Sequence, residues 1–187
     1  PASIHQTGRA LEATHLSAVP LTFERLLASA PGRAFLQDLE GGVVGGAPVT
    51  RDLADALSTT TLRVGYGQTE ASPGILLGAP GAFAPYYIGE PVGCSVRITA
   101  KGTLAFQGPN AHCARWAEGR MTYRPPDRWV DTGDRVRHEP GMGYFYEGRA
   151  NTTFKLANGR AVTASVWESR LHAAIPALRG ALVFPNE

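Results

Sequence analysis

Two short apolar strands that run directly into glycine turns constrain the fold of this chain more than any other feature. The first is Val43-Val44, followed by Gly45-Gly46, and the second spans residues 61–64, followed by Gly65-Tyr66-Gly67. Between them, residues 51–57 carry apolar side chains at helical spacing. A strand-helix-strand connection of this kind joins parallel strands. The sequence therefore predicts an α/β fold built on a β-α-β unit.

The second half of the chain has a different pattern. From Ile88 onward the helical periodicity disappears, and short runs rich in strand-forming residues alternate with Gly or Pro turns, at residues 96–98, 103–106, 130–136 and 144–146. Such spacing is typical of an antiparallel sheet. We interpret residues 109–126 as a loop whose Trp116 and Tyr123 pack on its own base.

The last segment predicts a small separate unit. Asn158-Gly159 favours a two-residue hairpin turn between residues 154–156 and 160–162, and Ser165 is placed to cap a final helix. A candidate domain boundary therefore falls near residues 149–152.

Composition argues against several function classes. The 187 residues carry a net charge of only +2 at pH 7, and Lys and Arg are dispersed, so we expect no nucleic-acid and no membrane partner. No apolar run approaches the roughly 20 residues that span a bilayer, and no signal-peptide pattern opens the chain. Cys94 and Cys113 lack metal-ligand spacing. We therefore expect a cytoplasmic protein with two reduced thiols.

The turn after the second strand carries groups suited to a nucleotide. A glycine-flanked turn directs backbone N–H groups and the Thr69 hydroxyl toward a bound anion. Glu70 offers a hard oxygen ligand for Mg²⁺ carried by phosphates, and Tyr66 offers a flat face for stacking on a base. If residues 66–70 are considered alone, an ordinary turn with exposed polar residues is the favoured interpretation.

Further downstream, two charged residues suit a ribose. Asp134 follows Thr132-Gly133 and can accept hydrogen bonds from both ribose hydroxyls, although an Asx-turn is the common alternative. We interpret Asp131 as structural. Arg149 carries a fixed fork of donors, but a lone Arg is more often a surface ion-pair residue. Lys155 is a further candidate, with a solvated strand residue as the ordinary alternative.

Two weaker signals concern the first half of the chain. Gly45-Gly46 lets a ligand approach the backbone closely, and a plain turn explains it almost as well. None of the five histidines is paired with Cys, Asp or Ser at a recognisable spacing, so we interpret them as structural or solvated. His15 is the one candidate pocket residue.

In their order along the chain, these motifs resemble those of the adenylate-forming superfamily, which contains acyl-CoA synthetases, luciferases and peptide-synthetase adenylation domains. The resemblance runs from about residue 14 to residue 184. The similar motifs are the adenine-side turn at residues 45–48, Tyr-Gly-x-Thr-Glu at 66–70, Thr-Gly-Asp at 132–134 after Asp131, Gly-Arg at 148–149 and Lys-Leu-Ala-Asn-Gly at 155–159. The last of these is similar to the long-chain acyl-CoA synthetase and carboxylic acid reductase branches.

The resemblance implies the domain organisation. Residues 1–149 would form the C-terminal half of the large nucleotide-binding domain, with the β-α-β unit and an antiparallel β subdomain. Residues 150–187 would begin the small α+β lid domain.

The resemblance also implies a reaction and a set of roles. A carboxylic acid is activated with ATP and Mg²⁺ as acyl-AMP, and the acyl group then passes to a thiol of CoA or phosphopantetheine, with a carrier protein as a possible partner. The implied catalytic residues are Thr69 at the phosphate, Glu70 at Mg²⁺ and Lys155 near the path of the thiol. The implied residues for ATP or AMP are Gly45, Gly46, Ala47, Tyr66, Gly67, Thr69, Asp134 and Arg149.

This sequence departs from the family pattern in four places. The Gly/Ser/Thr-rich phosphate loop and the C-terminal catalytic Lys are absent, the usual Gly-Glu-Leu is Gly102-Thr103-Leu104, and the hinge position falls on Asn151. We therefore expect the chain alone to be inactive and a companion segment or chain to complete the large domain. The alternative is a degenerate, non-catalytic binding or scaffold module that serves a partner protein. The acid, and the choice of thiol or amine acceptor, stay open.

Overall fold

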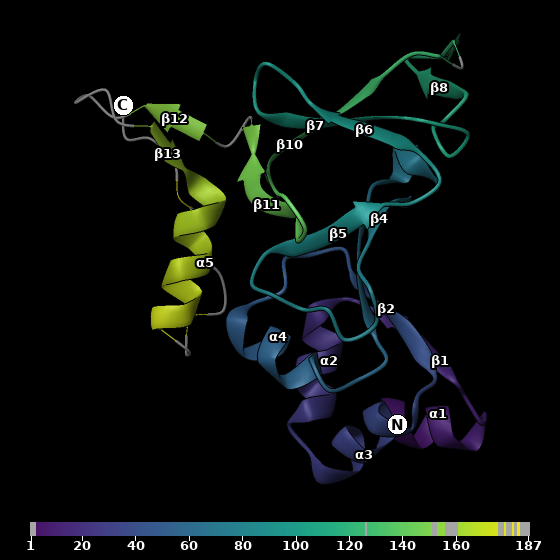
Figure 1. Ribbon diagram of the computed structural model, residues 1–187, viewed down its shortest axis with the longest axis vertical. Coiled ribbons are helices and arrows are strands. Elements are labelled where there is room, and N and C mark those ends of the chain that lie inside the picture. The colour runs from purple at the N-terminus through teal and green to yellow at the C-terminus, as the bar shows by residue number, and fades with distance from the viewer. Residues whose placement is uncertain are drawn as a thin grey trace.

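The computed structural model describes residues 3–125, 127–150, 153–155 and 161–175, together with positions 178, 181 and 183. Its main element is a nine-stranded sheet in the order β1-β2-β3-β4-β5-β11-β10-β7-β6 (Figure 1). The strands are β1 (His15–Ala18), β2 (Gly41–Gly45), β3 (Arg63–Gly67), β4 (Gly74–Leu77), β5 (Tyr87–Pro91), β6 (Ser95–Ile98), β7 (Thr103–Gln107), β10 (Val130–Glu139) and β11 (Gly143–Arg149).

The N-terminal part of the sheet is parallel and carries helices. β1 pairs with β2 and β2 with β3, all in parallel register, which confirms the predicted β-α-β unit. The helices are α1 (Ile4–Ala10), α2 (Pro20–Leu27), α3 (Ala30–Asp38) and α4 (Arg51–Leu57). Phe23, Phe35 and Leu57 from these helices pack with Val44 and Val64 of the strands into one buried core. Burial of this apolar face supplies the main stabilisation of the unit.

From β4 onward the sheet is antiparallel. β5 joins the two halves, because it pairs with β4 on one side and with β11 on the other. A second core lies here and includes Ile75, Leu104, Phe106 and Val136. The short β-rich runs between Gly and Pro turns therefore form the antiparallel sheet that the sequence predicts.

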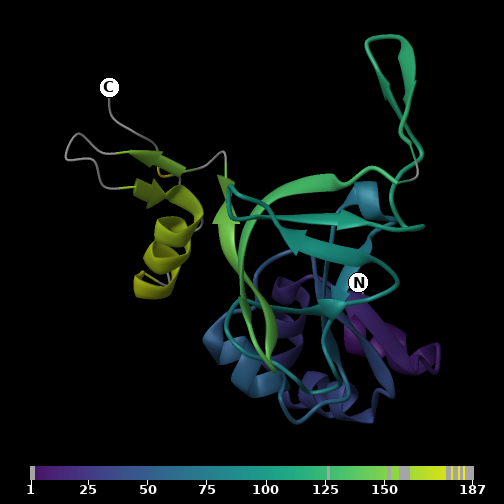
Figure 2. The same cartoon turned by 45° about the horizontal axis from the view of Figure 1, so that its top comes forward.

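Residues 109–126 were expected to be a self-packed loop, and that expectation is wrong. They contain a hairpin of β8 (Ala114–Ala117) and β9 (Arg120–Tyr123), which projects from the molecule in Figure 2. Trp116 is 66% exposed and Tyr123 is 76% exposed, so neither packs on the base. Strand-forming residues on both sides of Gly119 outweighed the Pro-rich ends of the segment.

The described residues after β11 form a two-stranded sheet and a helix. β12 (Thr153–Lys155) and β13 (Ala161–Thr163) pair antiparallel, and α5 (Ala164–Ala174) follows and lies against β11 (Figure 1). The expected turn at Asn158-Gly159 and the hinge position Asn151 lie outside the described residues. Across the described part of the chain, no helix is both long and apolar enough to span a membrane.

Candidate functional site

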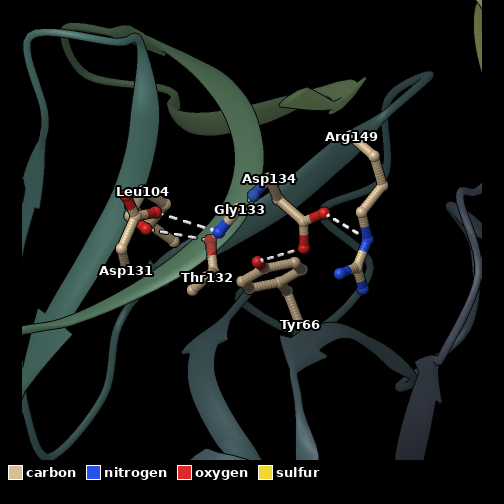
Figure 3. Close-up of polar contacts among 7 residues, drawn as sticks. All are labelled: Tyr66, Leu104, Asp131, Thr132, Gly133, Asp134 and Arg149. Carbon is tan, nitrogen blue, oxygen red and sulfur yellow. Dashed lines mark hydrogen bonds and ion pairs between the residues drawn. The ribbon is translucent and has the colours of Figure 1, made fainter. Parts of the chain in front are cut away.

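Three of the predicted site residues, one each from β3, β10 and β11, meet in one place (Figure 3). The Tyr66 hydroxyl donates a hydrogen bond to Asp134 Oδ2 at 2.7 Å, although 68 residues separate the two in sequence. Arg149 Nε lies 2.8 Å from the other oxygen, Asp134 Oδ1. The predicted aromatic, carboxylate and guanidinium groups therefore form one cluster around Asp134.

An irregularity in β10 creates this placement. Asp131 pairs with Ala105 of β7, and Arg135 pairs with Thr103. The chain therefore advances four residues along β10 while it advances only two along β7. The extra residues form a bulge. Gly133 lies inside it with a φ of +72°, a left-handed conformation that only glycine adopts readily.

Side-chain hydrogen bonds hold the bulge. The Thr132 hydroxyl donates to the Leu104 carbonyl at 2.8 Å and accepts from the Asp134 amide at 3.1 Å. On the other side of β10, Asp134 is opposite Arg149 in the register with β11. The Thr-Gly-Asp sequence is therefore the local means by which Asp134 is presented to Tyr66 and Arg149.

Burial dominates the electrostatics of Asp134. Its side chain is only 6% exposed, and this burial raises the pKa of the carboxyl above its ordinary value, against the opposing effects of the Tyr66 hydrogen bond and the Arg149 charge. Asp134 Oδ1 lies close to Arg149 as an ion pair, but the geometry of this contact is not that of a hydrogen bond, so Oδ1 has no hydrogen-bond donor among the described residues. The buried oxygen can therefore accept a hydrogen bond from a ligand hydroxyl.

The same environment affects the phenol. Burial first, and the Asp134 charge second, raise the pKa of Tyr66 far above its ordinary value. The phenol therefore remains a hydrogen-bond donor to Asp134 at any pH at which the protein functions.

We expect Tyr66→Phe to leave the alkaline titration of the folded protein unchanged. Tyr66 does not ionise between about pH 9 and about pH 11, where ordinary tyrosines do, so its removal takes nothing from the tyrosinate absorbance. The comparison is with the wild type, titrated under the same conditions. A clear reduction of the absorbance change in Tyr66→Phe would contradict the buried hydrogen bond to Asp134.

A hollow of about 130 Å³ adjoins the cluster. The predicted nucleotide residues in its walls are Gly46, Ala47, Tyr66, Gly67, Asp134 and Arg149. Tyr87 and Tyr146 also line it, and sequence reasoning missed both. Only the pairing of β5 and β11 brings them there, and no motif in the sequence marks them.

A second, more apolar hollow of about 550 Å³ is also lined by Tyr66. Val43, Leu76, Leu77 and Val92 contribute to its walls. It shares with the first hollow the residues Gly46, Gly65, Tyr66 and Gly67. Gly65 is required by close packing, because a Cβ there would lie 2.5 Å from Val43 Cγ1.

The remaining predicted residues lie elsewhere. Gly45 lines the second hollow rather than the first. Thr69 and Glu70 are exposed and begin a single turn of 3₁₀-helix, η1 (Thr69–Ala71), shortly after β3. Lys155 ends β12. Their roles at phosphate, Mg²⁺ and thiol stay predictions.

His15 is exposed and lines neither hollow. Its ring lies beside Gly41, where a Cβ would be 3.1 Å from two ring atoms.

Comparison with known proteins decides the family. The model of the family described as AMP-binding enzyme matches residues 1–124. The chain belongs to the AMP-binding enzyme family. Among its relatives, a feruloyl-CoA synthase from Amycolatopsis sp is 32% identical over 145 residues, covering 68% of this chain and 29% of that protein. Long-chain-fatty-acid–CoA ligase 1 from Homo sapiens is 28% identical over 156 residues, covering 74% of this chain and 22% of the ligase.

Solved structures share the fold of this chain. O-succinylbenzoate CoA synthetase from Bacillus subtilis, in complex with the acyl-adenylate intermediate OSB-AMP, has a TM-score of 0.77 at 19% identity over 97% of this chain and 40% of that one. The anthranilate CoA ligase AuaEII, in complex with anthranoyl-AMP, has a TM-score of 0.74 at 21% identity, covering 97% and 38%. The resemblance to the adenylate-forming superfamily is therefore confirmed. The chain spans less than a third of these two curated relatives and about two fifths of these structures.

Proposed function

We propose that this chain supplies the adenosine- and Mg²⁺-binding half of a ligase that activates a carboxylic acid with ATP as acyl-AMP and then transfers the acyl group to a thiol. The observation that carries the proposal is the convergence of Tyr66, Asp134 and Arg149 beside a hollow lined by Gly46 and Ala47. Membership of the AMP-binding family supports it.

The cluster suits the adenosine part of ATP. Asp134 Oδ1 is buried and has no aligned hydrogen bond, which fits an acceptor for a ribose hydroxyl. Arg149 is half exposed, with 52% of its side chain accessible, so its outer nitrogens can reach a ribose or phosphate oxygen. Tyr66 lines both hollows, and from this position its ring could lie against the base.

The turn after β3 suits the phosphates. Thr69 would contact the phosphate, and Glu70 would hold Mg²⁺ together with phosphate oxygens. The bound cation supplies charge compensation while the carboxylate of the acid displaces pyrophosphate. The residues of this chain contribute by holding the nucleotide in position for that displacement.

The second hollow suits the acid. Its walls are mainly apolar, and it meets the nucleotide hollow at Tyr66 and Gly67. An acid with an apolar or aromatic body therefore fits better than a charged one. The names of the relatives, feruloyl-CoA synthase and long-chain-fatty-acid–CoA ligase, point the same way. Lys155 would lie near the incoming thiol of CoA or of a carrier protein.

A non-catalytic binding or scaffold module is the second candidate. The departures from the family pattern at Thr103 and Asn151 favour it, whereas the cluster around Asp134 favours the enzyme. Calorimetry with AMP shows whether the protein binds a nucleotide at all. ATP–pyrophosphate exchange shows whether it also catalyses adenylation, as only the enzyme would. A cytoplasmic location is part of the proposal.

The proposal is tested by ATP–pyrophosphate exchange with a panel of apolar and aromatic carboxylic acids. We expect the isolated chain to be at least about 100-fold less active than the chain with a companion segment that supplies the phosphate loop, because the groups for the β- and γ-phosphates would be missing. Equal activity of the isolated chain would contradict the need for a companion. Absence of both exchange and AMP binding in the completed protein would contradict the proposed function.

A further inference from the structure

Thr103 is the buried centre of a chain of hydroxyl contacts at the start of β7. The residue is only 1% exposed. Its hydroxyl donates to Asp131 Oδ2 at 3.1 Å and lies 2.6 Å from the Thr99 hydroxyl. Since the Thr103 hydrogen is directed at the carboxylate, Thr99 donates to Thr103. Thr99 in turn accepts from the Lys101 and Thr103 amides at 3.2 and 3.3 Å, so each hydroxyl in the chain has its partners.

The contacts end in the bulge that presents Asp134. Asp131 Oδ1 accepts a hydrogen bond from the Gly133 amide at 2.9 Å. The Asp131 carboxylate therefore links Thr103, bonded to Oδ2, with the bulge, bonded to Oδ1. The β7–β10 pairing is interrupted between Asp131 and Arg135. Within this gap, side-chain hydrogen bonds take the place of the regular ladder.

The geometry points to Thr103 as a positioning residue for the nucleotide site: acting through Asp131, its hydroxyl fixes the bulge from which Asp134 reaches the ligand. This inference rests on the proposed function, because it assigns Asp134 to the ribose. It also gives a physical reason for the departure from Gly-Glu-Leu in this chain. A glutamate at position 103 would face the Asp131 carboxylate with a like charge, whereas threonine donates a hydrogen bond to it.

The test compares AMP binding by the wild type and Thr103→Val in the chain together with any segment that completes the domain. Valine keeps the shape and removes the hydroxyl, and we expect the Kd for AMP to rise about fivefold. Thr103→Ser restores the hydroxyl and should bring the Kd back to within about twofold. The matched control is Thr60→Val, because Thr60 is also buried (8% exposed) and its hydroxyl donates to the Leu57 carbonyl, a contact outside this chain of hydroxyls. Thr60→Val should leave the Kd unchanged.

Two further measurements separate positioning from a general loss of stability. The effect of Thr103→Val should disappear for 2′,3′-dideoxy-AMP, which offers Asp134 no ribose hydroxyl. In a double-mutant cycle, Thr103→Val should add nothing to Asp131→Ala, because both remove the same support of the bulge.

The AMP-binding measurements distinguish a failure of the positioning role from a failure of the proposed function. If the wild type binds AMP and Thr103→Val binds it equally well, the positioning role is wrong and the proposed function stands. If Thr103→Val weakens AMP and dideoxy-AMP alike, or is additive with Asp131→Ala, the role is structural and the inference is again wrong. If the wild type does not bind AMP, the proposed function itself fails, and the inference with it.

Discussion

Asp134→Asn should weaken AMP binding by about 100-fold or more, because it replaces a charged acceptor for two ribose hydroxyls with a neutral amide. The Asp134 carboxyl is central to the site, since it joins Tyr66 to Arg149. Calorimetric titration with AMP measures the loss. The matched control is Asp55→Asn, which changes an exposed carboxylate on α4 and should leave the affinity unchanged.

The same substitution should not reduce the stability of the fold at pH 7. Because burial raises the pKa of Asp134 in the folded state, the folded protein binds more protons than the unfolded chain between the ordinary aspartate pKa and the raised one. The free energy of unfolding of the wild type therefore falls as pH rises through that interval and stays lower above it. The amide introduced by Asp134→Asn cannot titrate, so the stability of this variant relative to the wild type should increase from about pH 4 toward neutral pH.

Denaturant unfolding of both proteins across this pH range measures the difference. A large stability loss in Asp134→Asn at pH 7 would mean that the carboxylate is a structural ion-pair partner. Tight AMP binding by a well-folded Asp134→Asn would show that the ribose is held elsewhere.

Glu70→Gln should reduce acid-dependent ATP–pyrophosphate exchange by about 100-fold or more in the completed protein, because an amide is a far poorer Mg²⁺ ligand than a carboxylate. The Mg²⁺ concentration for half-maximal exchange should rise as well. Binding of AMP measured without Mg²⁺ should be unaffected, since Glu70 is exposed and does not line the hollow beside Asp134.

Glu24→Gln serves as the control for this substitution, because Glu24 is an exposed carboxylate on α2. If Glu70→Gln and Glu24→Gln behave alike at every Mg²⁺ concentration, Glu70 is an ordinary surface residue. A loss of AMP affinity without Mg²⁺ would instead place Glu70 at the adenosine.

The local parts of the fold follow from sequence patterns. Val43-Val44 before Gly45-Gly46 predicts a buried strand that ends in a turn, and the structure has β2 there. The alternation of β-rich runs with Gly and Pro predicts the antiparallel sheet. The hairpin of β8 and β9 was missed, because Pro109 and Pro125 near its ends indicated a loop and the Trp116–Met121 pair across it could not be recognised from spacing alone.

The site was predicted in part, through motifs with a direct physical meaning. Gly46, Ala47, Tyr66, Gly67, Asp134 and Arg149 do line one hollow. Asp131 was interpreted as structural, and its hydrogen bonds to Thr103 and Gly133 agree with that. Tyr87 and Tyr146 were not found, because their place in the wall depends on which strands pair.

The sequence by itself determined most of the local conformations and indicated the family, because turn glycines, strand-forming runs and short motifs act over a few residues. Only the tertiary structure decided that the Tyr66 hydroxyl is bonded to Asp134 and that Thr103 supports the bulge next to it. Those contacts join positions 68 and 28 residues apart. They exist because β3, β7, β10 and β11 belong to one sheet, and the order and register of strands in a sheet are set by packing of the whole domain rather than by any single segment.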